Sequence, residues 1–245
     1  LQGKKSNSTQ CPRKVFVPVN DGRLVAVNAD TGKACTDFGQ NGEVNLQEFM
    51  PYAYPGGYNP TSPGIVTGST VVIAGSVTDN YSSKEPSGVI RGYDVNTGKL
   101  LWVFDTGAAD PNAMPGEGTT FVHNSPNAWA PLAYDAKLDI VYVPTGVGTP
   151  DIWGGDRTEL KERYANSMLA INASTGKLVW NFQTTHHDLW DMDVPSQPSL
   201  ADIKNKAGQT VPAIYVLTKT GNAFVLDRRN GQPIVPVTEK PVPQT

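Results

Sequence analysis

The hydrophobic and polar positions of this chain alternate over short stretches, without the long periods of amphipathic helices. Four short apolar runs stand out, at residues 15–19, 71–75, 140–144 and 213–217. Runs of this length that are rich in Val, Ile and Tyr are typical of β-strands. Polar or Gly-rich residues follow each run, which predicts strands that end in loops available for function.

A longer pattern occurs four times, near residues 22–39, 89–105, 167–183 and 221–237. Each copy has an apolar strand, a polar turn in which Asp or Asn precedes a Gly, and a second strand. The Gly supplies the positive φ of a tight hairpin. Because the copies lie further apart than the roughly 40–50 residues of common propeller repeats, we expect long inserted loops, at 40–65 and 105–128. Trp102 and Trp180 each follow a turn lysine by three residues, and we expect both indoles to dock between neighbouring sheets.

These patterns predict an all-β protein of radially arranged antiparallel blades, a β-propeller. The helical pattern is confined to residues 157–166, and the 24 glycines and 20 prolines are spread along the chain. Residues 1–245 form about four blades, which do not close a typical ring and leave sheet faces exposed. Neither end, at 1–5 or 240–245, is typical of a domain terminus. We therefore expect the chain to be a piece of a longer protein.

Charge and cysteine content narrow the function classes. The net charge is -3 and charged residues make up 18% of the chain, so there is no basic surface of the kind that binds nucleic acid. No apolar run has the roughly 18 residues of a membrane span, and the sequence does not open with a signal peptide. Cys11 and Cys35 lack CxxC spacing, and either a disulfide or two buried thiols is compatible with them.

The polar stretch at residues 184–195 is the strongest candidate for a site. It holds two histidines, three aspartates and a tryptophan, a set that does not fill a core. A loop that carries a polar site and a hydrogen-bonded structural corner are both compatible with it. Asp79 and Asn80 are hard oxygen donors of the kind that bind Mg²⁺ or Ca²⁺, although an ordinary turn has the same residues.

Several motifs together resemble the quinoproteins, dehydrogenases that use pyrroloquinoline quinone (PQQ). The TGK-x-x-W repeats, residues 187–191 and residues 219–222 carry this resemblance. Residues 76–80, 125–131 and 149–155 are similar to the membrane-bound glucose dehydrogenases and their quinate/shikimate dehydrogenase relatives. The resemblance implies an eight-bladed propeller with the quinone near its axis. It also implies oxidation of a sugar to its lactone, with electrons passed to membrane ubiquinone at the periplasmic side of the bacterial inner membrane.

The resemblance also implies roles for residues in separate loops. Trp129 would stack on the flat cofactor, and Lys219 would donate to the quinone oxygens. Thr149 would line the same pocket. Asp79 and Asn80 would hold the divalent metal, Mg²⁺ or Ca²⁺, with Asp79 also next to the cofactor.

Asp191 would be the general base that takes the substrate proton. His187 and Trp190 would support the site, whereas Asp188 and Asp193 receive no role. A cation near the quinone suits the chemistry, because negative charge develops there as the substrate is oxidised.

Two departures and two alternatives accompany this interpretation. Alcohol-oxidising quinoproteins carry a disulfide between adjacent cysteines, unlike Cys11 and Cys35, and an Asn where this chain has Thr149. The substrate is either a glucose-type sugar or a cyclic polyol such as quinate or shikimate. A non-catalytic propeller that binds partner proteins shares the repeat, but has no need for Asp79, Trp129, Asp191 and Lys219 in four loops.

Overall fold

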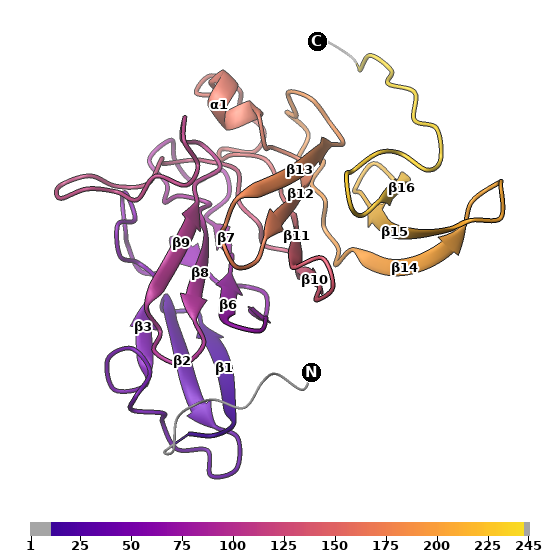
Figure 1. The fold of residues 1–245 in the computed structure, drawn as a ribbon. Coiled ribbons are helices and arrows are strands. Elements are labelled where there is room, and N and C mark those ends of the chain that lie inside the picture. Colours follow the sequence, from indigo (N-terminus) through magenta and orange to yellow (C-terminus); the bar gives the residue numbers. More distant parts are fainter. Residues whose placement is uncertain (1–10, 243–245) are drawn as a thin grey trace.

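The computed structural model describes residues 11–242, in which five antiparallel sheets accompany one short helix (Figure 1). Residues 1–5, which contributed to the expectation of a longer protein, lie outside this part. Within residues 11–242 no helix combines the length and the apolar character needed to cross a bilayer.

Four of the sheets follow one another along the chain. The first contains β1 (Lys14–Val19), β2 (Arg23–Asn28) and β3 (Glu43–Asn45). The second contains β5 (Ile65–Val66), β6 (Thr70–Ile73), β8 (Ile90–Asp94) and β9 (Leu100–Phe104). The third contains β10 (Ala133–Asp135), β11 (Ile140–Pro144), β12 (Ser167–Asn172) and β13 (Leu178–Gln183). The fourth contains β14 (Ser199–Lys204), β15 (Thr210–Leu217) and β16 (Ala223–Asp227), and β4 (Tyr58–Asn59) pairs with β7 (Ser76–Val77).

The hydrophobic core lies between successive sheets, which form an arc from β1 to β16 (Figure 1). Along β6, Val71 and Ile73 pack toward the first sheet while Val72 packs toward the third. Along β11, Val141 faces the second sheet and Tyr142 faces the fourth. Side chains alternate between the faces of a strand, so a blade buried on both faces needs a continuous apolar run. This explains the apolar runs in the sequence and confirms an all-β propeller architecture.

The four predicted turns share one conformation. Their glycines have φ of 69°, 71°, 72° and 73°, at Gly32, Gly98, Gly176 and Gly231. Each glycine N–H donates to the carbonyl four residues earlier, which closes the turn. Positive φ costs little only for glycine, so this position is fixed by backbone geometry.

The expected docking of two indoles between sheets is confirmed. Trp102 on β9 donates from Nε1 to the Ala173 carbonyl of the third sheet at 3.0 Å, and its ring lies against Gly176. Trp180 on β13 makes the equivalent bond to the Arg228 carbonyl of the fourth sheet at 3.2 Å. Through these indoles the second and the third sheet each contact the turn of the next sheet along the chain.

Two expectations change in detail, and one question that the sequence left open is answered. The helix α1 (Glu159–Glu162) is shorter than residues 157–166, and the Thr158 hydroxyl caps it. Residues 40–65 are not a simple loop, because β3, β4 and the start of β5 lie there, whereas 105–128 contains no strand or helix. Cys11 and Cys35 form a disulfide, one of the two arrangements that the sequence left open.

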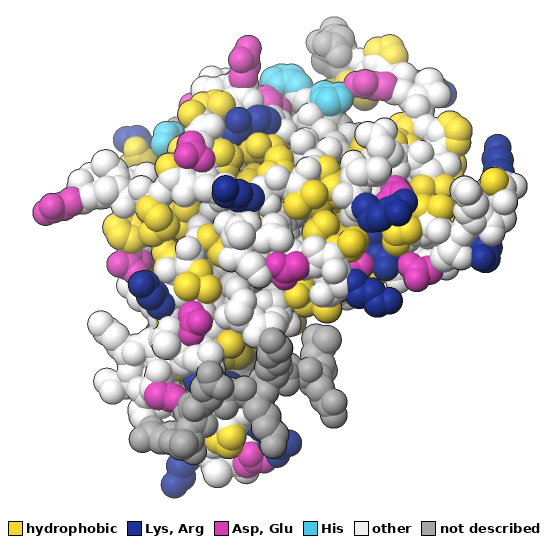
Figure 2. Space-filling model, in the orientation of Figure 1, with side chains coloured by type: hydrophobic (Ala, Val, Ile, Leu, Met, Phe, Trp, Pro, Cys, Tyr) yellow, Lys and Arg dark blue, Asp and Glu magenta, His cyan; other side chains and the backbone are white. Residues whose placement is uncertain are grey.

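Charged side chains of both signs are interspersed over the face in Figure 2. The histidine side chains gather toward the end of the molecule at which α1 lies (Figures 1 and 2). Long polar loops follow β7, β11 and β13. These loops contain several of the candidate site residues that the sequence predicts.

Candidate functional site

Loops from successive sheets enclose a cavity of about 280 Å³, close to the lower end of the roughly 300–1,000 Å³ typical of small-molecule sites. The residues that line it are Thr61, Ser76, Asp79, Asn127, Trp129, Val147, Asp151, Asp191, Asp193 and Lys219. Of the residues that the sequence singled out for a site, four line this one cavity: Asp79, Trp129, Asp191 and Lys219. They come from segments that follow β7, precede β10, follow β13 and follow β15.

Asp193, which received no role from the sequence, accepts hydrogen bonds from three of the residues that line the cavity. Its Oδ2 accepts from Trp129 Nε1 at 2.9 Å and from Lys219 Nζ at 3.0 Å. Its Oδ1 accepts from the Val147 N–H at 3.0 Å. A Cβ at position 146 would come within 2.5 Å of Oδ1, so Gly146 leaves room for the carboxylate. The buried Asp193 therefore holds both the indole and the ammonium in place.

Lys219 lies between two carboxylates and beside an aromatic face. Its Nζ is 2.8 Å from Asp191 Oδ2 and 5.6 Å from the centre of the Trp129 ring. Burial works against the charge on Lys219, but its hydrogen bonds to Asp191 and Asp193 outweigh burial, so the pKa of Lys219 is raised. The ammonium consequently stays charged at neutral pH and is available to an electron-rich ligand atom.

Asp191 has the features of a general base. Burial and the nearby charge of Asp193 raise its pKa above the ordinary value, although the hydrogen bond from Lys219 opposes the rise. A raised pKa makes the carboxylate a stronger proton acceptor. Asp191 also has a φ of 58°, a left-handed conformation that is uncommon outside glycine and that concentrates at functional sites.

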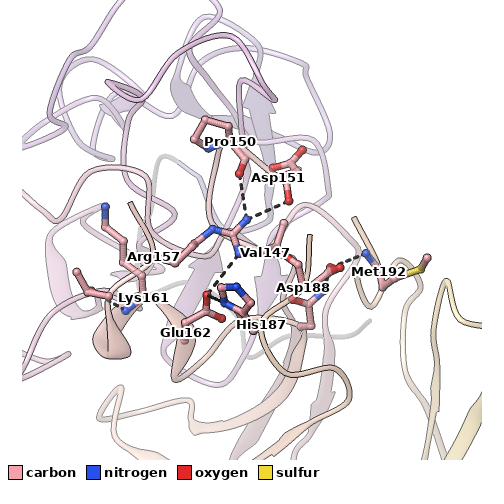
Figure 3. A network of polar contacts seen from close by, with 12 residues as sticks. Val147, Pro150, Asp151, Arg157, Lys161, Glu162, His187, Asp188 and Met192 are labelled. Carbon is pink, nitrogen blue, oxygen red and sulfur yellow. Dashed lines mark hydrogen bonds and ion pairs between the residues drawn. The ribbon is translucent and has the colours of Figure 1, made fainter. Parts of the chain in front are cut away.

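The stretch 184–195 contains a hydrogen-bonded structural corner at Asp188 and also supplies two residues, Asp191 and Asp193, to the lining of the cavity. Asp188 is fully buried and accepts from Asn166 Nδ2 at 2.8 Å and from the backbone N–H groups of Trp190 and Met192 at 2.8 and 2.5 Å. These bonds fold the loop so that Asp191 reaches the cavity. His187 does not line the cavity, and its Nδ1 lies 3.0 Å from Glu162 Oε1 (Figure 3). The Trp190 side chain is 41% exposed.

Asn80 and Thr149 do not line the cavity. Asn80 adjoins it, since its Nδ2 donates to Asp151 Oδ2 at 3.3 Å and its Oδ1 accepts from the Ile152 N–H at 3.2 Å. Thr149 is buried, and both its carbonyl and its hydroxyl accept from Asn124 Nδ2, at 2.8 and 3.3 Å. Asn80 is thus one contact from the cavity, through Asp151.

Asp151 is a cavity residue that sequence reasoning quoted within a motif but did not assign. Burial, followed by the charges of Asp79, Asp191 and Asp193, raises its pKa to about 7. Burial and the charge of Asp193 also raise the pKa of Asp79. Four carboxylates thus face a single ammonium, and the cavity has an excess of negative charge.

The donor chemistry fits a hard divalent cation and a flat, electron-poor cofactor. Among residues 11–242, no three His, Cys, Asp or Glu side chains form a complete metal site by themselves. The oxygens of Asp79 and Asp151 nevertheless lie in a cavity whose excess of carboxylates would stabilise a bound cation. Oxygen ligands are those that Ca²⁺ and Mg²⁺ prefer. Trp129 offers an aromatic face, and Lys219 a hydrogen-bond donor, for a planar quinone.

The raised pKa of Asp151 predicts how stability depends on pH. Because its folded-state pKa of about 7 exceeds the unfolded value of about 3.9, the folded protein binds the extra proton within that window. Its carboxylate therefore lowers the free energy of unfolding as the pH rises toward 7. Asp151→Asn is expected to raise that free energy by roughly 1–3 kcal/mol at pH 8, and by less at pH 5.

The measurement is urea unfolding of the full-length protein in EDTA at the two pH values. Saturating Ca²⁺ should shrink the gain, since the cation compensates the same charge. A variant that is less stable than wild type at pH 8 would contradict the electrostatic explanation.

The fold and the site together define a propeller of the quinoprotein class. Residues 1–245 match the family described as "PQQ: Glucose/ethanol/alcohol dehydrogenase, beta-propeller domain", and the chain belongs to this family. It is 98% identical, over its whole length, to quinoprotein glucose dehydrogenase A of Acinetobacter calcoaceticus, and covers 31% of that protein. It is 45% identical to the quinate/shikimate dehydrogenase (quinone) of Acinetobacter baylyi, with 96% of this chain and 29% of that protein covered.

A solved structure supports the same fold. The quinohemoprotein alcohol dehydrogenase ADHIIG from Pseudomonas putida HK5 is 28% identical and superposes with a TM-score of 0.71 over 91% of this chain and 32% of that one. The chain therefore spans a little less than a third of the relatives that it matches.

Proposed function

We propose that this chain forms the cofactor-binding part of a PQQ-dependent dehydrogenase that oxidises a glucose-type aldose to its lactone. The observation that carries the proposal is the convergence of Asp79, Trp129, Asp191 and Lys219 on one cavity from four separate loops. A propeller that only binds partner proteins has no need for an aromatic face, an ammonium and a base in one hollow.

Each of these side chains has a chemical task in the proposed reaction. When bound, the quinone supplies the oxidising group that accepts the two electrons of the substrate. Asp191 accepts the proton of the substrate hydroxyl at its carboxylate. Lys219 would donate a hydrogen bond from its ammonium to a cofactor oxygen and would offset negative charge there. Trp129 would pack its face on the flat ring system, and its hydrogen bond to Asp193 holds the indole in its present orientation.

Asp79, with Asn80 beside it, would contribute oxygens to the divalent cation, Ca²⁺ or Mg²⁺. We add Asp151 to this wall of the site, because its carboxylate contacts Asn80 and lines the cavity. Thr149 would act from behind this wall, since it precedes Asp151 by two residues and is held by Asn124. The cation would neutralise the excess of carboxylates.

The identities favour glucose over quinate or shikimate as the substrate, since the relative named as a glucose dehydrogenase is 98% identical and the quinate/shikimate relative is 45% identical. We further propose that the electrons pass to membrane ubiquinone and that the chain lies on the periplasmic side of the inner membrane. The Cys11–Cys35 disulfide supports an oxidising compartment.

Cofactor binding is tested by titration with PQQ in the presence of Ca²⁺ or Mg²⁺, followed by tryptophan fluorescence. This chain and the full-length Acinetobacter relative are titrated in parallel. We expect saturable, metal-dependent quenching that Trp129→Phe largely loses, because the quenched indole is the one in contact with the cofactor. Trp153→Phe is the matched control, since Trp153 is 50% exposed and does not line the cavity. Equal quenching in both variants would contradict the assignment of Trp129.

A further inference from the structure

We propose that Arg157 is a positioning residue of the site, which fixes the loop of Asp151 against the loop of Asp191. This inference rests on the proposed function, because it assigns Arg157 to the geometry of the cofactor cavity. Arg157 lies just before α1 and does not line the cavity. Its side chain is 2% exposed and lies among Pro150, Asp151 and Asp188 (Figure 3).

Three backbone carbonyls from two loops converge on this guanidinium. One terminal nitrogen donates to the carbonyls of Pro150 and Asp151, both at 3.0 Å. The other donates to the carbonyl of Asp188 at 3.1 Å. The first loop follows β11 and the second follows β13, so the two loops are held to each other through Arg157.

The charge of Arg157 is compensated on its far side. Its second terminal nitrogen is 3.7 Å from Glu162 Oε1, and the same oxygen lies 3.0 Å from His187 Nδ1 (Figure 3). A buried charge is tolerated where hydrogen bonds and a counter-ion surround it, and removing one partner leaves the others unsatisfied. The network therefore depends on the guanidinium.

The two loops that Arg157 joins each contribute a carboxylate to the lining of the site, Asp151 and Asp191. Asp151 lines the cavity and contacts Asn80, on the side assigned to the cation. In the second loop, the side chain of Asp188 folds the turn that places Asp191 at the cavity. The backbone carbonyl of the same Asp188 accepts a hydrogen bond from Arg157. A planar guanidinium reaches all three carbonyls at once, whereas the compact ammonium of lysine does not reproduce this fork. The spacing between the cation side and the base is therefore set by Arg157.

The test compares Arg157→Lys with Arg163→Lys in the full-length Acinetobacter relative. Arg163, the residue that directly follows α1, is a matched control because it too is partly buried, donates to the backbone carbonyl of Ala108 and stacks on Tyr164. Ala108 does not line the cavity. The measurements are the Kd of PQQ in saturating Ca²⁺ by tryptophan fluorescence, the Ca²⁺ concentration for half-maximal binding, kcat, KM and Tm.

We expect Arg157→Lys to raise both the PQQ Kd and the Ca²⁺ midpoint at least tenfold and to lower kcat, while Arg163→Lys changes each less than twofold at a similar loss of Tm. Glu162→Gln is the milder variant should Arg157→Lys not fold, and it should shift the Ca²⁺ midpoint in the same direction by two- to fivefold. If the changes in PQQ Kd, Ca²⁺ midpoint and kcat were proportional to the loss of Tm in all variants, the positioning role of Arg157 would be overturned, and the proposed function would stand. Absence of PQQ binding by the wild type would instead overturn the proposed function, and this inference with it.

Discussion

Asp191→Asn in the full-length Acinetobacter relative is expected to retain PQQ and to lose turnover by roughly 10²–10⁴-fold. The amide keeps the shape of the carboxylate, so the cavity and its contact with Lys219 Nζ at 2.8 Å can persist. It does not accept the hydroxyl proton, and the base is therefore removed while binding is left in place. The experiment measures kcat for glucose oxidation together with the PQQ Kd.

Asp110→Asn serves as the control, since Asp110 is exposed and does not line the cavity. It should match wild type in both quantities. Normal turnover by Asp191→Asn would show that another group takes the proton, and Asp151 would be the next candidate because its pKa is raised to about 7. Loss of PQQ binding together with turnover would assign Asp191 to binding.

Trp102→Ala is expected to lower the free energy of unfolding by roughly 3–5 kcal/mol, the cost of deleting a large buried aromatic side chain. Trp102 is 5% exposed and fills the space between the second and third sheets. The change also leaves the Ala173 carbonyl without its indole donor. Chemical unfolding of the full-length relative, followed by circular dichroism, measures the effect.

Trp153→Ala is the matched comparison for this prediction, because it removes the same side chain from a half-exposed position. Its effect should stay within about 1 kcal/mol, as for most surface substitutions. If both variants lost the same stability, the docking of Trp102 would not be the source of the stabilisation between sheets.

The arrangement of charge in the cavity supports the proposal that the site binds a divalent cation. Asp79, Asp151, Asp191 and Asp193 face one another across a cavity with a single ammonium. Their repulsion and burial raise the pKa values of three of them, Asp79, Asp151 and Asp191. Such unfavourable charge is stored where a cation is to bind, since binding then relieves it. The same argument explains why Asp151→Asn should stabilise the metal-free protein.

The strands, the turns and the docking indoles were predictable from the sequence because they depend on local chemistry. Two-residue alternation and apolar runs define strands within a few positions. The turn itself requires a residue with φ near 70°, which favours glycine. Gly98 and Gly176 therefore identify their turns in the sequence independently of the tertiary structure around them. The resemblance of the polar motifs to the quinoproteins added candidates for the site, and four of them share the cavity.

The pairings across the site were decided by tertiary structure alone. Asp193 and Trp129 are 64 residues apart, and no local pattern distinguishes the aspartate that holds the indole from Asp188, which only folds the loop. The sequence places Arg157 at the start of the predicted helical segment. In the structure its guanidinium instead binds backbone carbonyls of two loops. Hydrogen bonds between distant residues depend on how the sheets pack, and the chain encodes that packing only through the whole set of contacts. Residue propensities and the spacing of apolar residues therefore predict the strands of the blades. The packing of the sheets decides which carboxylate holds the indole and which one only folds a loop.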